Sequence, residues 1–126
     1  MGIFSGLFSK KSTRSEVAAE LSRLGCDIHS HFIPGIDDGA KDMEDSIGML
    51  RSFSEMGYKK VITTPHVMSD YYRNTSEIIL SGLEKVREEL KKQQIPLEID
   101  AAAEYYLDFE VEKKICLLYT SPSPRD

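Results

Sequence analysis

The sequence lacks the marks of several common protein classes. It has two cysteines, Cys26 and Cys116, which are too few and too far apart for a disulfide framework or a paired-cysteine metal site. No apolar stretch approaches the roughly 20 residues that a membrane-spanning helix needs. We therefore expect no stable membrane insertion, and the reducing cytoplasm is the simplest location for such a chain.

Charge and missing motifs exclude further classes. Acidic residues outnumber basic ones by 21 to 16, and the net charge of −5 gives no reason to expect a nucleic-acid partner. The chain has no glycine-rich phosphate loop ending in Gly-Lys-Ser/Thr and no G-x-S-x-G nucleophile elbow. Neither cysteine has an arginine six positions later, as cysteine-based phosphatases require. An acidic protein can still bind phosphate through metal ions, which reverse the local field.

The apolar pattern predicts alternating strands and helices. Strands are predicted at residues 25–28, 60–64 and 97–102, and a polar loop at residues 67–73. Asp42 and Asn74 are the predicted N-caps of the two helices between the strands. Their apolar stripes are Ile47, Leu50, Phe53 and Met56 in the first helix and Ile79, Leu83, Val86 and Leu90 in the second. This order indicates an α/β fold with a parallel sheet.

The two ends do not fit the alternation. We expect a tail with a short helix in residues 1–24 and the α/β segment in residues 25–115. Residues 116–126 carry Ser-Pro repeats and resemble translated read-through, so we expect an artefactual or disordered tail there. Three βα units cannot close a barrel, and the predicted fold is therefore a truncated part of one.

All three histidines of the chain lie at the ends of predicted strands. His29 and His31 form an H-x-H pair, and their side chains point the same way if the strand continues through them. His66 follows the second strand, and Glu104 follows the third. Barrel enzymes place polar ligands at these carboxyl ends of parallel strands.

An aspartate pair, Asp37-Asp38, adds carboxylates to the imidazoles, and this mixed donor set suits Mn, Fe or Zn. Taken singly, each feature has a plainer explanation: a packed histidine, a turn before Gly39, or a solvated strand end at Glu104. Together they favour a metal site. Two metals about 3.5–4 Å apart would suit phosphoryl transfer.

The loop after His66 offers further candidates. Arg73 could contact a phosphate, and Tyr71 and Tyr72 could stack on an aromatic substrate. Ordinary loop positions are the alternative for all three.

Three blocks carry a family resemblance: D-I-H-S-H at 27–31, P-G-I-D-D-G at 34–39 and T-T-P-H at 63–66. With Glu104 and its neighbours, they resemble the bacterial PHP-domain tyrosine phosphatases, manganese-dependent enzymes of capsule and exopolysaccharide loci. The resemblance implies a distorted (β/α)7 PHP-type barrel, of which this chain would hold the first three βα units. It also implies hydrolysis of phosphotyrosine, on a bacterial tyrosine kinase that controls polysaccharide export, by a metal-activated hydroxide.

The resemblance also implies the metal ligands, namely His29, His31, Asp38 rather than Asp37, His66, and a bridging Glu104. The complete site would hold two to three ions, manganese first, with iron or zinc as alternatives. No catalytic side chain is expected. The family's later ligands have no counterpart here, so we expect the chain alone to be inactive. The alternatives are another PHP phosphoesterase, such as a histidinol-phosphate phosphatase, or a non-catalytic metal-binding remnant.

Overall fold

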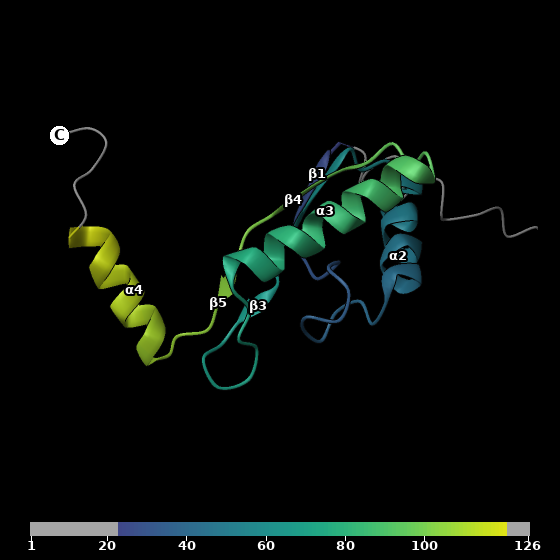
Figure 1. The fold of residues 1–126 in the computed structure, drawn as a ribbon. Helices are drawn as coiled ribbons and strands as arrows, with labels where there is room; N and C mark the ends of the chain where they lie inside the picture. The colour runs from purple at the N-terminus through teal and green to yellow at the C-terminus, as the bar shows by residue number, and fades with distance from the viewer. Residues whose placement is uncertain (1–22, 121–126) are drawn as a thin grey trace, which may run out of the picture.

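The computed structural model describes residues 23–120, so most of the predicted helix near the amino end and the last Ser-Pro repeats lie outside the described residues. Figure 1 shows α3 lying across the main sheet, α2 beside it, and α4 standing apart at the other end. The main sheet is parallel, with the order β1 (Cys26–Ser30), β2 (Lys60–Thr63), β4 (Glu98–Ala101). The other elements are α2 (Met43–Glu55), β3 (His66–Val67), α3 (Ser76–Lys92), β5 (Glu104–Tyr105) and α4 (Phe109–Thr120). The predicted parallel α/β pattern is confirmed.

The described helices begin where side chains satisfy their first N–H groups. The carboxylate of Asp42 accepts a hydrogen bond from the Asp45 N–H at 2.9 Å, which confirms the predicted cap of α2. The predicted cap of α3 is wrong. Thr75 caps that helix, because the Asn74 amide instead donates to the carbonyls of Ile36 and His66.

The core lies between the main sheet and the two helices. Val61 of β2 and Ile99 of β4 face each other in register and are buried, and Leu50 of α2 is fully buried. The four predicted apolar residues of α3 are all buried. The Thr63 hydroxyl accepts a hydrogen bond from the Phe32 N–H and donates to the Ser30 carbonyl, which ties β2 to the chain after β1. The α/β layer is thus held by both apolar packing and buried hydrogen bonds.

The strands differ from the prediction at their carboxyl ends. β1 runs to Ser30, so His29 lies inside it. Residues 66–67 form β3, so Val67, predicted as the first residue of the loop, lies in a strand. The predicted third strand ends at Ala101, and the chain pairs again only as β5. β3 and β5 form a separate parallel pair, because the chain leaves the main sheet at Pro65, which has no N–H to continue the ladder.

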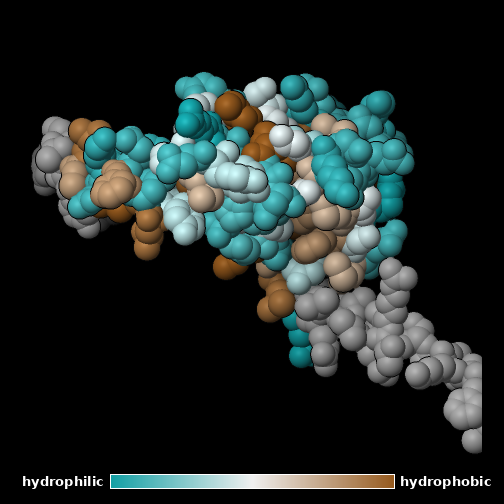
Figure 2. Space-filling view, turned by 90° about the horizontal axis from the view of Figure 1, so that it is seen from below, coloured by the Kyte–Doolittle hydropathy of each residue, from teal (hydrophilic) through white to brown (hydrophobic). Residues whose placement is uncertain are grey.

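Helix α4 continues to Thr120, so the predicted boundary after Ile115 falls inside a helix. Much of its apolar surface is exposed, as are the side chains just before it. Figure 2 shows brown side chains at the end of the molecule that carries α4. No helix of the described residues is long and apolar enough to cross a membrane.

Candidate metal centre

The predicted ligands come together at the carboxyl ends of the strands. His29 lies in β1 and His31 directly follows that strand. His66 of β3 is the register partner of Glu104 of β5. Because in-register residues of parallel strands point to the same face, the imidazole and the carboxylate lie side by side.

One carboxylate oxygen lies between all three imidazoles. Glu104 Oε2 is 3.5 Å from His29 Nε2, 3.3 Å from His31 Nε2 and 3.5 Å from His66 Nδ1. This oxygen is buried and has no hydrogen-bond partner. Two ligand atoms bound at about 2.1 Å to one tetrahedral ion would lie about 3.4 Å apart. The spacing and the unsatisfied oxygen therefore fit a shared cation.

The ligand atoms form two overlapping groups. His29, His31 and Glu104 make one, and His31, Asp38 and His66 make the other, with the atoms of each group within 4.8 Å of one another. In the second group, Asp38 Oδ1 is 3.3 Å from His66 Nε2. The structure thus brings together all five residues predicted as ligands, in two groups that overlap at His31.

The cluster is open on one side and closed on the other. The side chains of His29 and Asp38 are 65% and 64% exposed, whereas that of His31 is 18% exposed. Water and a substrate can therefore approach from the side of His29 and Asp38.

The predicted aromatic candidates lie beside the cluster. The Tyr72 ring stacks on His66, with ring centroids 5.5 Å apart and planes 14° apart. Tyr71 meets Tyr72 edge-on and is itself exposed. Burial raises the pKa of the Tyr72 hydroxyl, and the nearby Asp38 carboxylate adds to this shift. Tyr72 therefore stays neutral at physiological pH, and its ring restricts the orientation of His66.

Arg73 is not brought to the cluster. Its Nε donates to the Ser69 carbonyl at 2.8 Å. The side chain lines a separate cavity of about 190 Å³ with Tyr105 and Lys114, and none of the five clustered residues lines that cavity. Its contact with a phosphate stays a prediction.

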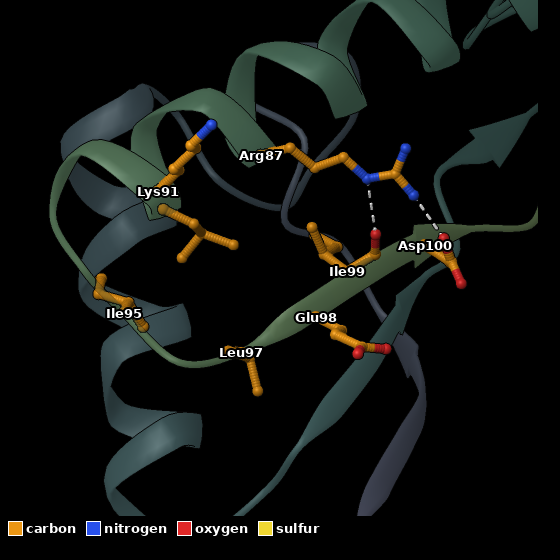
Figure 3. Close-up of a pocket in the computed structure, with 8 residues that line it drawn as sticks. Arg87, Lys91, Ile95, Leu97, Glu98, Ile99 and Asp100 are labelled. Carbon is orange, nitrogen blue, oxygen red and sulfur yellow. Dashed lines mark hydrogen bonds and ion pairs between the residues drawn. The ribbon is translucent and has the colours of Figure 1, made fainter.

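Another cavity, of about 370 Å³, lies between α3 and β4 (Figure 3). Arg87 runs along this strand, where its Nε donates to the Ile99 carbonyl at 3.0 Å and its terminal nitrogen to Asp100 at 2.5 Å. Lys60 also bonds the Asp100 carboxylate and lowers its pKa. These charges are paired with each other, so this cavity offers no comparable set of ligands.

Two features of the site were missed by the sequence analysis. One is the pairing of β3 with β5. The sequence indicates it only by an equal spacing, because His66 follows Thr63 by three residues and Glu104 follows Ala101 by three residues. The other is the role of Asp37, which lies beneath the cluster instead of in it.

Comparison with known proteins places this arrangement in a family. The sequence model of the family described as "Capsular polysaccharide synthesis, CpsB/CapC" matches residues 25–118. The chain belongs to this family.

Named relatives are tyrosine phosphatases. Tyrosine-protein phosphatase YwqE of Bacillus subtilis is 35% identical over 89 residues, which are 71% of this chain and 35% of the relative. Tyrosine-protein phosphatase CpsB of Streptococcus pneumoniae is 30% identical, over 71% of this chain and 37% of the relative. The chain therefore spans a little over a third of the length of the curated relatives it matches.

A solved structure agrees with the sequence comparison. It comes from work on YwqE of Bacillus subtilis and CpsB of Streptococcus pneumoniae, described as unique metal-dependent tyrosine phosphatases. The TM-score is 0.67 at 34% identity, and the match covers 73% of this chain and 37% of that chain. The similarity supports the α/β fold.

Proposed function

We propose that this chain provides part of the metal centre of a protein-tyrosine phosphatase that hydrolyses phosphotyrosine. The observation that carries the proposal is the position of Glu104 Oε2, which is buried, unsatisfied and within 3.5 Å of nitrogens from three histidines. The names of the relatives supply the reaction, and favour phosphotyrosine over a small phosphomonoester such as histidinol phosphate.

The five clustered residues would hold the ions. His29, His31 and Glu104 would bind one, and Asp38 and His66 would bind a second beside it. We propose manganese, with iron or zinc as alternatives, because imidazole and carboxylate donors accept all three. When bound, the ions would supply Lewis acidity toward the phosphate ester and the attacking water. No side chain is proposed as the nucleophile.

The neighbouring aromatic residues would position the reacting groups. Tyr72 holds the His66 ring by stacking, and the exposed Tyr71 lies where an aromatic substrate ring could pack. We propose a phosphorylated bacterial tyrosine kinase of capsule synthesis as the substrate. We propose a cytoplasmic location, which would match that substrate. Both cysteines are free, as the reducing cytoplasm would keep them.

The fold would be the first three βα units of a (β/α)7 PHP-type barrel. Since the chain spans about a third of its relatives, and their remaining length would carry further ligands, we propose that the chain alone has little activity.

Titration of the metal-free chain with Mn²⁺, followed by calorimetry, tests the proposal. We expect binding that is at least about tenfold weaker in Glu104→Gln, because the carboxylate lies between all three imidazoles. Glu98→Gln, at the exposed amino end of β4, is the matched control and should bind normally. Equal affinity in all three chains would contradict the proposal.

A substrate assay tests the reaction. Slow hydrolysis of a phosphotyrosine peptide that needs Mn²⁺ and Glu104 would support the phosphatase assignment. Faster hydrolysis of histidinol phosphate than of the peptide would overturn it.

A further inference from the structure

One carboxylate beneath the cluster is more deeply buried than any predicted ligand. The side chain of Asp37 is 1% exposed. Its Oδ2 lies 2.8 Å from His31 Nδ1 and accepts a hydrogen bond from the His66 backbone N–H at 3.1 Å. Its Oδ1 accepts a hydrogen bond from the Gly39 N–H at 3.0 Å. Asp37 therefore touches two of the clustered histidines, one through its ring and one through its backbone.

We infer that Asp37 is a positioning residue for the metal centre, an inference that rests on the proposed function. A carboxylate can only accept hydrogen bonds, so His31 Nδ1 carries the proton. The neutral ring then presents an unprotonated Nε2, the atom that lies 3.3 Å from Glu104 Oε2. Asp37 thus fixes the tautomer that a metal ligand needs.

The same carboxylate also joins the two strands that supply the histidines. His31 follows β1, His66 begins β3, and Oδ2 of Asp37 bonds to both. Because these strands belong to different sheets, no backbone ladder sets the distance between the two imidazoles directly. Oδ2 of Asp37 is a single buried oxygen that contacts both histidines, in addition to the bonds of Thr63 and Thr64 to Ser30.

The loop is shaped to keep Asp37 in this place. The Ala40 N–H donates to the His31 carbonyl at 3.0 Å. A Cβ on Gly39 would overlap with the backbone of His31, so only glycine allows this approach. The chain therefore folds back on His31, with Asp37 underneath and Asp38 outside, where its side chain is 64% exposed. The two neighbouring aspartates would therefore have different roles: Asp37 positions the histidine ligands, and Asp38 is itself a proposed ligand.

Nitrogen NMR of the metal-free chain at mildly alkaline pH tests the inference directly. We expect His31 to carry its proton on Nδ1 in the unmodified chain. An Nε2-protonated His31 would overturn the inference without any variant. In Asp37→Asn, an amide NH₂ facing Nδ1 would move the proton to Nε2. If the amide oxygen faced the ring instead, Nδ1 would keep its proton and the NH₂ would oppose the Gly39 N–H. Asp37→Ala, which offers the ring no acceptor, is therefore the second variant and should lose the preference for Nδ1.

Manganese affinity provides the second measurement, with Asp38→Asn as the matched variant. Asp37→Ala and Asp38→Asn should both bind Mn²⁺ about 10–100-fold more weakly, but only Asp37→Ala should change the His31 tautomer. An Asp37→Ala chain with unchanged tautomer and affinity would overturn the inference. Absence of Mn²⁺ binding by the unmodified chain would count against the proposed function, and the His31 tautomer would still decide the role of Asp37.

Discussion

Helices α3 and α4 both carry apolar side chains. The apolar stripe of α3 packs against other elements, whereas most of the apolar side chains described in α4 are exposed. α3 buries four residues against the sheet and α2. Around the start of α4, Leu107 and Phe109 are 87% and 85% exposed, and only Val111 is buried among the described residues of that helix. Figure 2 shows brown side chains among hydrophilic ones at this end of the molecule. Apolar spacing predicts that a helix has an apolar face, but the face stabilises the fold only when another element packs on it.

The sharpest test of this comparison is one truncation in each region. Leu83→Ala removes a buried side chain of α3 and leaves a cavity, which should lower the free energy of unfolding by about 2–5 kcal/mol. Phe109→Ala removes a larger but exposed ring and should change it by no more than about 0.5 kcal/mol. Urea denaturation measures both. Similar losses would mean that α4 is packed in solution.

A smaller effect is expected from two helical glycines. A Cβ on Gly82 of α3 would overlap with Cγ2 of the buried Ile33, so Gly82→Ala should destabilise the fold by about 1–3 kcal/mol. A methyl group on Gly48 of α2 would meet nothing within 4 Å, and Gly48→Ala should stabilise by about 0.5–1 kcal/mol because alanine favours the helix. Opposite shifts in melting temperature are the expected result. Stabilisation by Gly82→Ala would show that α3 packs less closely on Ile33 than the structure indicates.

The smallest effect concerns the attachment of α4. Hydrogen bonds from the backbone N–H groups of Ser69 and Val111 lower the pKa of Asp108 to about 2. In the unfolded chain the Asp108 carboxyl has a pKa of about 3.9. The stabilisation is therefore present above that pH and is lost as the pH falls toward about 2. Protection of the Val111 amide, relative to its intrinsic exchange rate at each pH, should fall over this interval more than in α3. In Asp108→Asn this fall should be absent, and an unchanged profile would contradict the role of Asp108.

Much of this fold follows from local sequence signals. The cap at Asp42 and the apolar stripe of α3 were predictable, because each depends on a few neighbouring residues. The cap of α3 was not, because the competing partners of Asn74 come from residues 36 and 66. A long-range hydrogen bond of this kind leaves no mark in the local pattern.

The site, like the fold, was predictable where it depends on local sequence signals and not where it depends on contacts between distant residues. Metal-binding residue types at strand ends indicated His29, His31, His66 and Glu104, and the family resemblance added Asp38 rather than Asp37. The structure brings all five together. The two-residue strands β3 and β5 are too short to show an apolar period, so their pairing could not be predicted. Asp37 and Asp38 differ in burial, at 1% and 64% exposed, and adjacent identical residues do not reveal this difference in the sequence.

The register of β3 with β5 makes the lengths of two connectors part of the design of the site. Thr64 and Pro65 separate β2 from β3, and Ala102 and Ala103 separate β4 from β5. Removing one residue from either connector would turn His66 or Glu104 to the opposite face, because side chains alternate along a strand. Over evolutionary time, insertions and deletions should therefore be excluded from these connectors and should collect in the loop between β3 and α3.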